Sequence, residues 1–299
     1  MKDSDFERMG FMRVFSIQAN PIAALKIALD ALKTDSSARL LFISNLLFLI
    51  FALLEQVEYG TIIFIYVCQS IIIGYFHIIK YLLFDITGPS DSEILSVQGD
   101  NKGSLVRLFK PNSPVTYNAR QKRGWAFFFI IHFGLVNLIF LNIETVYSNT
   151  SEFIFYSIIL FFITHLFSFL TNLKKDLAKQ WTLGEMMFLP YLRIIPNFLV
   201  VYCLFLLGFL FIPLSIFYAI LANNPLLATQ NHAWGKGTAS AILITIFVII
   251  KTLVDLVTHS FIHQNEKIAE KEISNFELIK IGAGATIIFA IILYFFLRL

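Results

Sequence analysis

Long apolar runs recur along this chain, and they constrain its fold more than any other feature. One run, AILITIFVII, precedes Lys251, and another contains IIIGYFHIIK. About 20 such residues cross the hydrocarbon core of a bilayer as one helix. Lipid offers no hydrogen bonds to the backbone, so only helices or closed barrels can span it. Barrel strands alternate polar and apolar residues, whereas these runs are continuous. The sequence therefore predicts an all-α, polytopic transmembrane helix bundle.

The composition agrees with a membrane protein and excludes an ordinary soluble domain. Hydrophobic residues make up 57% of the 299 residues and charged residues only 14%, with 33 Phe. The partner we expect is therefore the lipid bilayer. Nothing in the sequence indicates nucleic-acid binding, and no protein partner is indicated. We expect a multi-pass protein of a cell membrane, the inner or plasma membrane of a prokaryote.

The apolar runs divide the chain into an N-terminal segment and about seven spans. Residues 1–37 are polar and contain an amphipathic stretch, NPIAALKIALDALK, which predicts an interfacial or packed helix. The bundle, residues 38–299, has spans at about 39–54, 60–84, 124–143, 153–173, 193–221, 238–259 and 277–297. The loop 85–123 is rich in Gly, Pro, Ser and Asn, which predicts irregular structure rather than a domain.

Lys and Arg residues alternate between the two ends of these spans. Six lie at or before residue 39, where the first span begins, and seven lie in the segment 80–123. The loops after the first and third spans have none. Basic residues concentrate in cytoplasmic loops. The pattern predicts a cytoplasmic N-terminus, a cytoplasmic loop 85–123 and an outside C-terminus.

A stripe of polar residues marks the candidate site. Lys251, Asp255, His259 and His263 are each four residues apart, so they lie on a slowly drifting face of one helix. Ionisable groups at membrane depth are costly and usually mark a function. The predicted topology also brings His77, His132 and His165 into the same cytoplasmic-side layer.

The residue types in this layer suggest two kinds of site. Imidazole and carboxylate groups are common metal ligands, so a divalent metal could be held by five residues: His132, His165, Asp255, His259 and His263. A small polar ligand could instead contact Lys251, Arg193, Gln69 and His77. Simpler interpretations remain open, because Lys251 and Asp255 could form an intrahelical ion pair. Lys80 and Arg193 could likewise be anchors at span ends.

Several segments resemble a prokaryotic integral-membrane family that is known only as a domain of unknown function. These are YVCQSIIIGYFHIIK, IHFGLVNLIF, THLFSFLTN, PYLRIIPNFLV and IKTLVDLVTHSFIH, within residues 41–263. The resemblance implies a fold of several helices and no established activity. It leaves the N-terminal helix and the seventh span outside. The chain departs from the family pattern at Gln69, where the family has Glu, at His77, where it has Asn, and at Asn197, which stands near an expected His. The resemblance therefore implies an altered site.

The function we expect first is binding of a metal ion or a small polar ligand by the cytoplasmic-side cluster. A metal-dependent intramembrane enzyme acting on a lipid-soluble substrate is the first alternative, with Asp255, His259 and His165 as ligands or acid–base groups. A transporter or channel is the second. The sequence does not decide whether the protein is an enzyme.

Overall fold

The computed structural model describes residues 21–57, 59–89, 114–143, 151–191, 193, 238–263 and 274–298. Seven helices carry most of these residues: α3 (Pro21–Thr34), α4 (Ser36–Leu54), α5 (Tyr59–Leu83), α8 (Ala119–Ile143), α9 (Ser151–Ala178), α12 (Thr238–His263) and α13 (Asn275–Arg298). Residues 183–191 are also helical. The expected N-terminal segment before residue 21 and the expected fifth span beyond Arg193 lie outside the described residues.

The structure is mostly helical, as predicted, and the length and composition of its helices are consistent with a membrane protein. Four described helices are long and apolar enough to cross a bilayer: Ser36–Leu54, Gly60–Leu83, Glu152–Ala178 and Asn275–Ile292. α8 and α12 occupy two further ranges that the sequence marks as spans. The total of seven spans and their orientation remain predictions.

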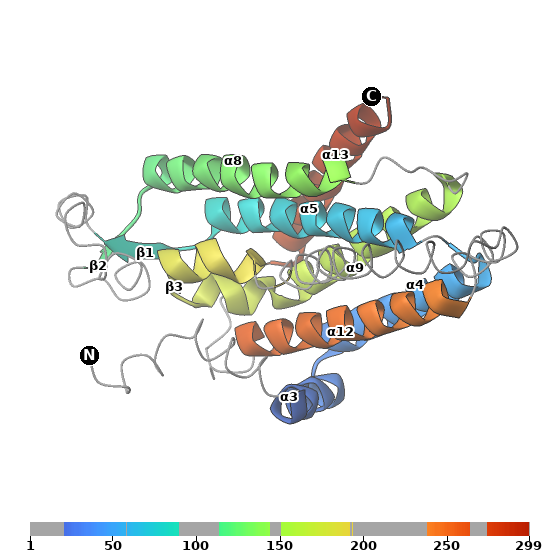
Figure 1. Ribbon diagram of the computed structural model, residues 1–299. Coiled ribbons are helices and arrows are strands. Elements are labelled where there is room, and N and C mark those ends of the chain that lie inside the picture. The colour runs from blue at the N-terminus through green and yellow to red at the C-terminus, as the bar shows by residue number, and fades with distance from the viewer. Residues whose placement is uncertain are drawn as a thin grey trace, which may run out of the picture.

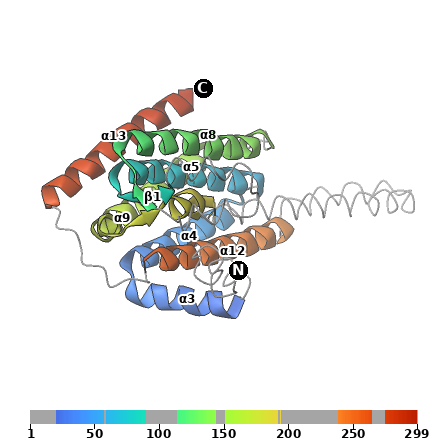
Figure 2. The same cartoon turned by 90° about the vertical axis from the view of Figure 1, so that its left-hand side faces the viewer.

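The helices form two packed groups that meet along α4 and α9. α5 packs between α8 and α9, while α12 packs against α3 and α4 (Figure 1). α13 runs obliquely across the bundle and contacts α9, as Figure 2 shows. Aromatic rings fill the space between the two groups, with Tyr66 5.1 Å from Phe247 and 5.3 Å from Phe48 between ring centroids. These contacts bury the middle of the bundle.

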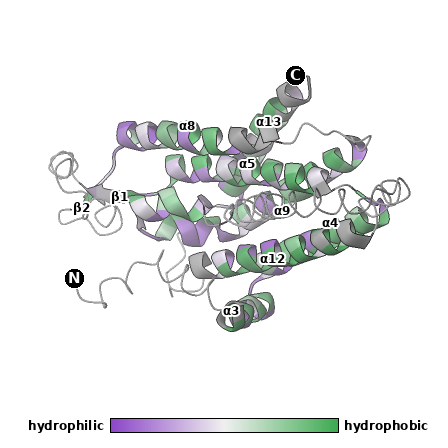
Figure 3. Ribbon diagram, viewed as in Figure 1, coloured by the Kyte–Doolittle hydropathy of each residue, from purple (hydrophilic) through white to green (hydrophobic). Residues whose placement is uncertain are grey.

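The outer surfaces of the helices are apolar, as expected for a protein in lipid. Large side chains such as Phe42, Ile50, Ile249 and Ile287 are exposed on α4, α12 and α13. In Figure 3 hydrophilic residues gather at the end of α8 that adjoins the strands. This distribution agrees with apolar helix walls in contact with acyl chains and a polar end at the membrane surface.

A small sheet forms where the sequence indicated only an irregular loop. β1 (Ile86–Pro89) pairs antiparallel with β2 (Pro114–Thr116) and parallel with β3 (Trp181–Thr182). The strands are too short to show an alternating pattern, so the sequence did not reveal them. Residues 90–113 lie outside the described residues. The pairing of β1 with β3 carries the segment after α9 to the end of α5, where it closes a polar cavity.

The ends of α4 are set by local hydrogen bonds. Asp35 caps the N-terminus, because its Oδ1 accepts hydrogen bonds from the backbone N–H groups of Ser37 and Ala38. At the other end the N–H of Val57 donates to the carbonyl of Ala52, and that of Gln56 to the carbonyl of Leu53. This is a Schellman motif, with Gln56 at φ 50°. A single residue, Asp35, therefore separates α3 from α4.

Candidate functional site

A polar cavity of about 60 Å³ lies between α5, α9 and the segment that follows β3. A water molecule needs about 10–15 Å³ of such space, so the cavity has room for several waters or one small ligand. Its polar lining consists of His77, Lys80, His165, Ser168 and Arg193, and its apolar lining of Ile73, Phe76, Phe169, Trp181, Leu189 and Pro190. Within this described lining two side chains are basic and none is a carboxylate.

Helical spacing brings the lining residues together. Ile73, Phe76, His77 and Lys80 recur every three or four residues, so they share one face of α5. His165, Ser168 and Phe169 share a face of α9 in the same way. A capping box between Thr182 and Glu185 starts the helical segment 183–191, which supplies the third wall.

Lys80 is held at the edge of the cavity by an ion pair. Its Nζ lies 2.7 Å from Oδ2 of Asp176, and it sits 5.6 Å and 5.7 Å from the ring centroids of Phe84 and Trp181. The indole Nε1 of Trp181 donates a hydrogen bond of 2.8 Å to the backbone carbonyl of Asp176. Lys80 is therefore more than an anchor at a span end, because the ion pair fixes its ammonium group beside the cavity.

Two buried histidines, His77 and His165, line the cavity, and each forms a hydrogen bond through Nε2. His77 Nε2 contacts the backbone carbonyl of Met186, which can only accept, so this nitrogen carries a proton. His165 Nε2 lies 3.3 Å from Nε2 of Gln69, which can only donate. With the amide in this orientation, the Nε2 of His165 is the acceptor and the proton of a neutral ring sits on Nδ1.

Gln69 places an unsatisfied polar atom behind His165. Its side chain is fully buried, and its Oε1 has no hydrogen-bond partner within the described part of the protein. Reversing the amide would pair Oε1 with His165 and leave Nε2 without a partner. A buried polar atom without a partner costs about 1–3 kcal/mol. In either orientation one buried polar atom of the Gln69 side chain, next to the cavity wall, has no partner among the described residues.

Arg193 supplies the second basic group of the cavity. Its side chain is partly buried, and it follows the helical segment 183–191. Lys80 and Lys251 each pair with a carboxylate, and the charges of Asp255 and Asp176 also act on the Arg193 guanidinium group. A guanidinium group beside a small cavity is suited to bidentate contact with a phosphate or carboxylate.

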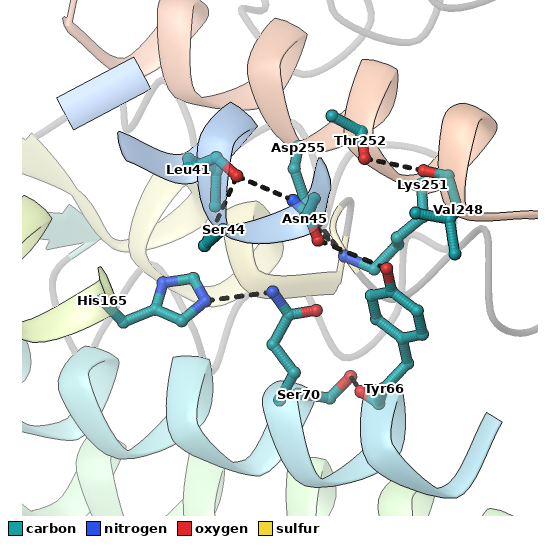
Figure 4. A network of polar contacts seen from close by, with 11 residues as sticks. Leu41, Ser44, Asn45, Tyr66, Ser70, His165, Val248, Lys251, Thr252 and Asp255 are labelled. Carbon is teal, nitrogen blue, oxygen red and sulfur yellow. Dashed lines mark hydrogen bonds and ion pairs between the residues drawn. The ribbon is translucent and has the colours of Figure 1, made fainter. Parts of the chain in front are cut away.

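A second polar centre lies between α4, α5 and α12. Lys251 Nζ is 2.6 Å and 2.7 Å from the two carboxylate oxygens of Asp255, and both side chains are fully buried. Figure 4 shows this pair facing Tyr66 and Asn45. The Tyr66 hydroxyl donates to Oδ1 of Asn45 at 3.3 Å, and Asn45 Nδ2 donates to the carbonyl of Leu41 at 3.1 Å. The i,i+4 pair that the sequence suggested is thus present, with its own polar surroundings.

A third centre joins α12 to the junction of α3 and α4. His259 Nε2 lies 2.8 Å from Oδ2 of Asp35 and 2.7 Å from Oγ of Ser37, which also accepts a 3.1 Å hydrogen bond from Asn172 Nδ2. Burial alone would raise the pKa of Asp35. The hydrogen bond and charge of His259 and the hydrogen bonds of Ser37 outweigh burial and hold the pKa of this carboxyl well below its usual range.

The set Ser37, His259 and Asp35 does not have the geometry of a catalytic triad. In a triad the nucleophile and the acid contact opposite ring nitrogens. Here both contact Nε2, and the Ser37 hydroxyl also lies 2.8 Å from Oδ1 of Asp35. The arrangement therefore fixes the helix junction and does not activate Ser37.

The predicted site residues divide among these three centres. His77, His165 and Arg193 meet at the cavity, with Gln69 behind them; Lys251 and Asp255 form the ion pair, and His259 joins the helix junction. His132 is exposed on α8 and contacts the hydroxyl of Tyr191. The side chain of His263 lies outside the described residues.

No metal centre forms within the part of the chain that the structure describes. There, no three His, Cys, Asp or Glu side chains come close enough together to hold an ion. The sequence did not single out Asp176, Trp181 or Ser37 as site residues. For Asp176 the available sequence signal was its spacing: it follows Asn172 by four residues, so the two polar side chains share one face of α9.

The profile of a family of unknown function, DUF6498, matches residues 28–272, more than half of the chain. The chain belongs to the DUF6498 family. The three centres described above all lie within the matched range. The match begins at residue 28, so it includes the second half of α3, which we expected to lie outside; α13 lies beyond it. A search of curated proteins and a search of solved structures each found no match.

Proposed function

We propose that this DUF6498 protein binds a small anionic ligand in the cavity between α5, α9 and residues 181–193. The observation that carries the proposal is the lining: Lys80 and Arg193 stand beside His77, His165 and Ser168, with no carboxylate among the described lining residues. The two cations and the Ser168 hydroxyl match a phosphate or carboxylate, which needs positive charge and several donors.

The charges of the two basic residues support different roles. Asp176 already balances Lys80, so the lysine contributes orientation and one donor. Arg193 adds a second cation, whose planar guanidinium group can offer two parallel donors to one anion. The apolar residues Ile73, Phe76 and Phe169 lower the local dielectric, which strengthens each charged contact.

The other expected functions have less support. The metal site and the metal-dependent enzyme both need a group of His and carboxylate donors, and the described residues contain no such group. A transporter or channel needs a path through the bundle, and the cavity of about 60 Å³ is not such a path. By the positive-inside pattern, the cavity lies at the cytoplasmic end of a multi-pass protein of a cell membrane.

Binding can be tested by the thermal stability of the detergent-purified protein. Inorganic phosphate, sulfate and acetate would each be added at constant ionic strength against chloride. A ligand at 100 times its Kd stabilises the folded state by about 2.7 kcal/mol, so a cognate anion should raise the Tm. Absence of a shift with every one of these anions would contradict the proposal.

The variant Arg193→Gln tests the site itself, and Arg120→Gln is the matched control. Both remove one guanidinium, but Arg120 is exposed on α8, away from the cavity. A hydrogen bond to a charged group contributes about 1.5–3 kcal/mol, so Arg193→Gln should weaken the affinity by at least about tenfold. Arg120→Gln should leave it unchanged. Equal affinities in the two variants would place the anion elsewhere.

A further inference from the structure

α3 exposes a continuous apolar stripe next to the side that packs on the bundle. Ile22 is 80% exposed, Leu25 52% and Leu29 47%. At about 100° per residue these three side chains fall within an arc of about 60°. Such a stripe is costly in water, because each large apolar side chain gains about 1.5–3 kcal/mol when it leaves water.

The rest of the helix circumference has a definite order. Ala28 and Ala31 form the buried side and pack with Leu256 and Val257 of α12 and with Ala38 and Leu41. The exposed stripe comes next, and Lys26, Lys33 and Asp30 follow on its other side. Going around α3, the environment thus changes from protein to apolar and exposed, and then to charged and exposed.

The position of α3 in the bundle explains what can cover the stripe. Asp35 joins α3 directly to the first turn of α4, and α3 packs on the part of α12 near its C-terminal end. The first turn of α4 and the C-terminal part of α12 are both ends of apolar helices. The ends of membrane-spanning helices lie where the acyl chains of a bilayer give way to the headgroups. α4, which Asp35 joins to α3, also exposes large apolar side chains in its first half, at Phe42, Ile43 and Leu46.

We propose that α3 lies in the membrane interface, with Ile22, Leu25 and Leu29 among the lipid acyl chains and Lys26 and Lys33 at the phosphates. Amphipathic helices bind this way, with the apolar side at the headgroup–acyl boundary and lysines on the polar side. Long lysine side chains reach from the apolar boundary to the headgroups. The occupant of the stripe is therefore phospholipid. The inference is independent of anion binding at the cavity.

Tryptophan substitution in the full-length protein tests this orientation. Leu25→Trp places the probe on the stripe, and Asp30→Trp places it on the charged side at a position that is also exposed. Both variants would be reconstituted into phosphatidylcholine–phosphatidylglycerol vesicles, and the emission of Trp125, Trp181 and Trp234 would be subtracted with the wild-type protein. Lipids with brominated acyl chains report contact with lipid, and aqueous iodide reports contact with water.

We expect brominated lipid to quench Leu25→Trp and iodide to leave it unaffected, with the reverse for Asp30→Trp. Equal quenching of both variants by iodide would overturn the proposal. So would protection of Leu25→Trp from both quenchers, because protein, from this chain or a second copy, would then cover the stripe. Quenching of Asp30→Trp by lipid alone would place the whole helix inside the bilayer and also overturn it. Leu29→Trp repeats the test on the same stripe and decides the result if Leu25→Trp fails to fold.

Discussion

His259 Nε2 lies 2.8 Å from Oδ2 of Asp35, although the two residues are 224 positions apart in the chain. Asp35 directly follows α3 and is the N-cap of α4, so one residue links α3, α4 and α12. The hydrogen bond from Asn172 to Ser37 adds α9 to the same junction. Four helices therefore depend on a few polar atoms at one end of the bundle.

The first prediction concerns the coupling of these two residues. Asp35→Asn keeps a good N-cap but removes the charge, while His259→Gln removes the imidazole. We expect each single variant to lower the free energy of unfolding by about 1–3 kcal/mol, since a buried group loses its partner. The double variant should lose less than the sum of the two, with a coupling energy of about 0.5–3 kcal/mol. Equilibrium unfolding in detergent would measure all four proteins, and strict additivity would contradict the interaction.

The second prediction concerns pH. The pKa of Asp35 is lowered in the folded protein, whereas an unfolded Asp has a pKa of about 3.9. A lowered pKa stabilises the folded state above the unfolded value, and this stabilisation is lost as the pH falls toward the folded value. The free energy of unfolding should therefore fall more steeply below about pH 4 in the wild-type protein than in Asp35→Asn. Parallel pH profiles for the two proteins would show that Asp35 does not contribute.

The third prediction concerns the pair Lys251–Asp255. Both side chains are fully buried, so removing one charge leaves the other without compensation. We expect Lys251→Met to cost about 3–5 kcal/mol of stability. The double variant Lys251→Met/Asp255→Leu should recover most of this loss, because two apolar side chains replace a costly ion pair. Measurement of unfolding free energies decides the point, and a double variant that is less stable than the single variant would refute this account.

The fourth prediction concerns the contact of α5 with α8. A Cβ atom on Gly74 would come within 2.6 Å of Cε1 of Phe133, which is buried and stacks on Phe129 at 4.9 Å. Gly74→Ala should therefore lower the Tm, with a cost of about 1–3 kcal/mol for overpacking. Gly134→Ala is the control, because no atom lies within 4 Å of its added Cβ. That variant should be neutral or stabilising by up to about 1 kcal/mol. Equal Tm values for the two variants would mean that the helices separate freely at this point.

The sequence was informative where the physical signal is local. Continuous apolar runs predicted the helices, because a backbone in lipid must satisfy its hydrogen bonds within each segment. The spacing of Lys251 and Asp255 left an i,i+4 ion pair open as the simpler interpretation, and helical geometry alone brings the two together. The four-residue spacing of His259 and His263 also suggested a metal site, and no group of three metal donors forms in the described ranges.

The cavity and the helix junction needed the tertiary structure. Lys80 and Asp176 are 96 residues apart, and their pairing depends on how α5 packs on α9. The short strand at Trp181 brings the third wall of the cavity to α5, and two residues of strand carry no readable periodicity. The sequence by itself determined that this protein is a bundle of apolar helices with charged groups inside it. Only the tertiary structure decided which of those groups meet, because helix packing in a bundle selects partners through side-chain shape and long-range hydrogen bonds that no local spacing encodes.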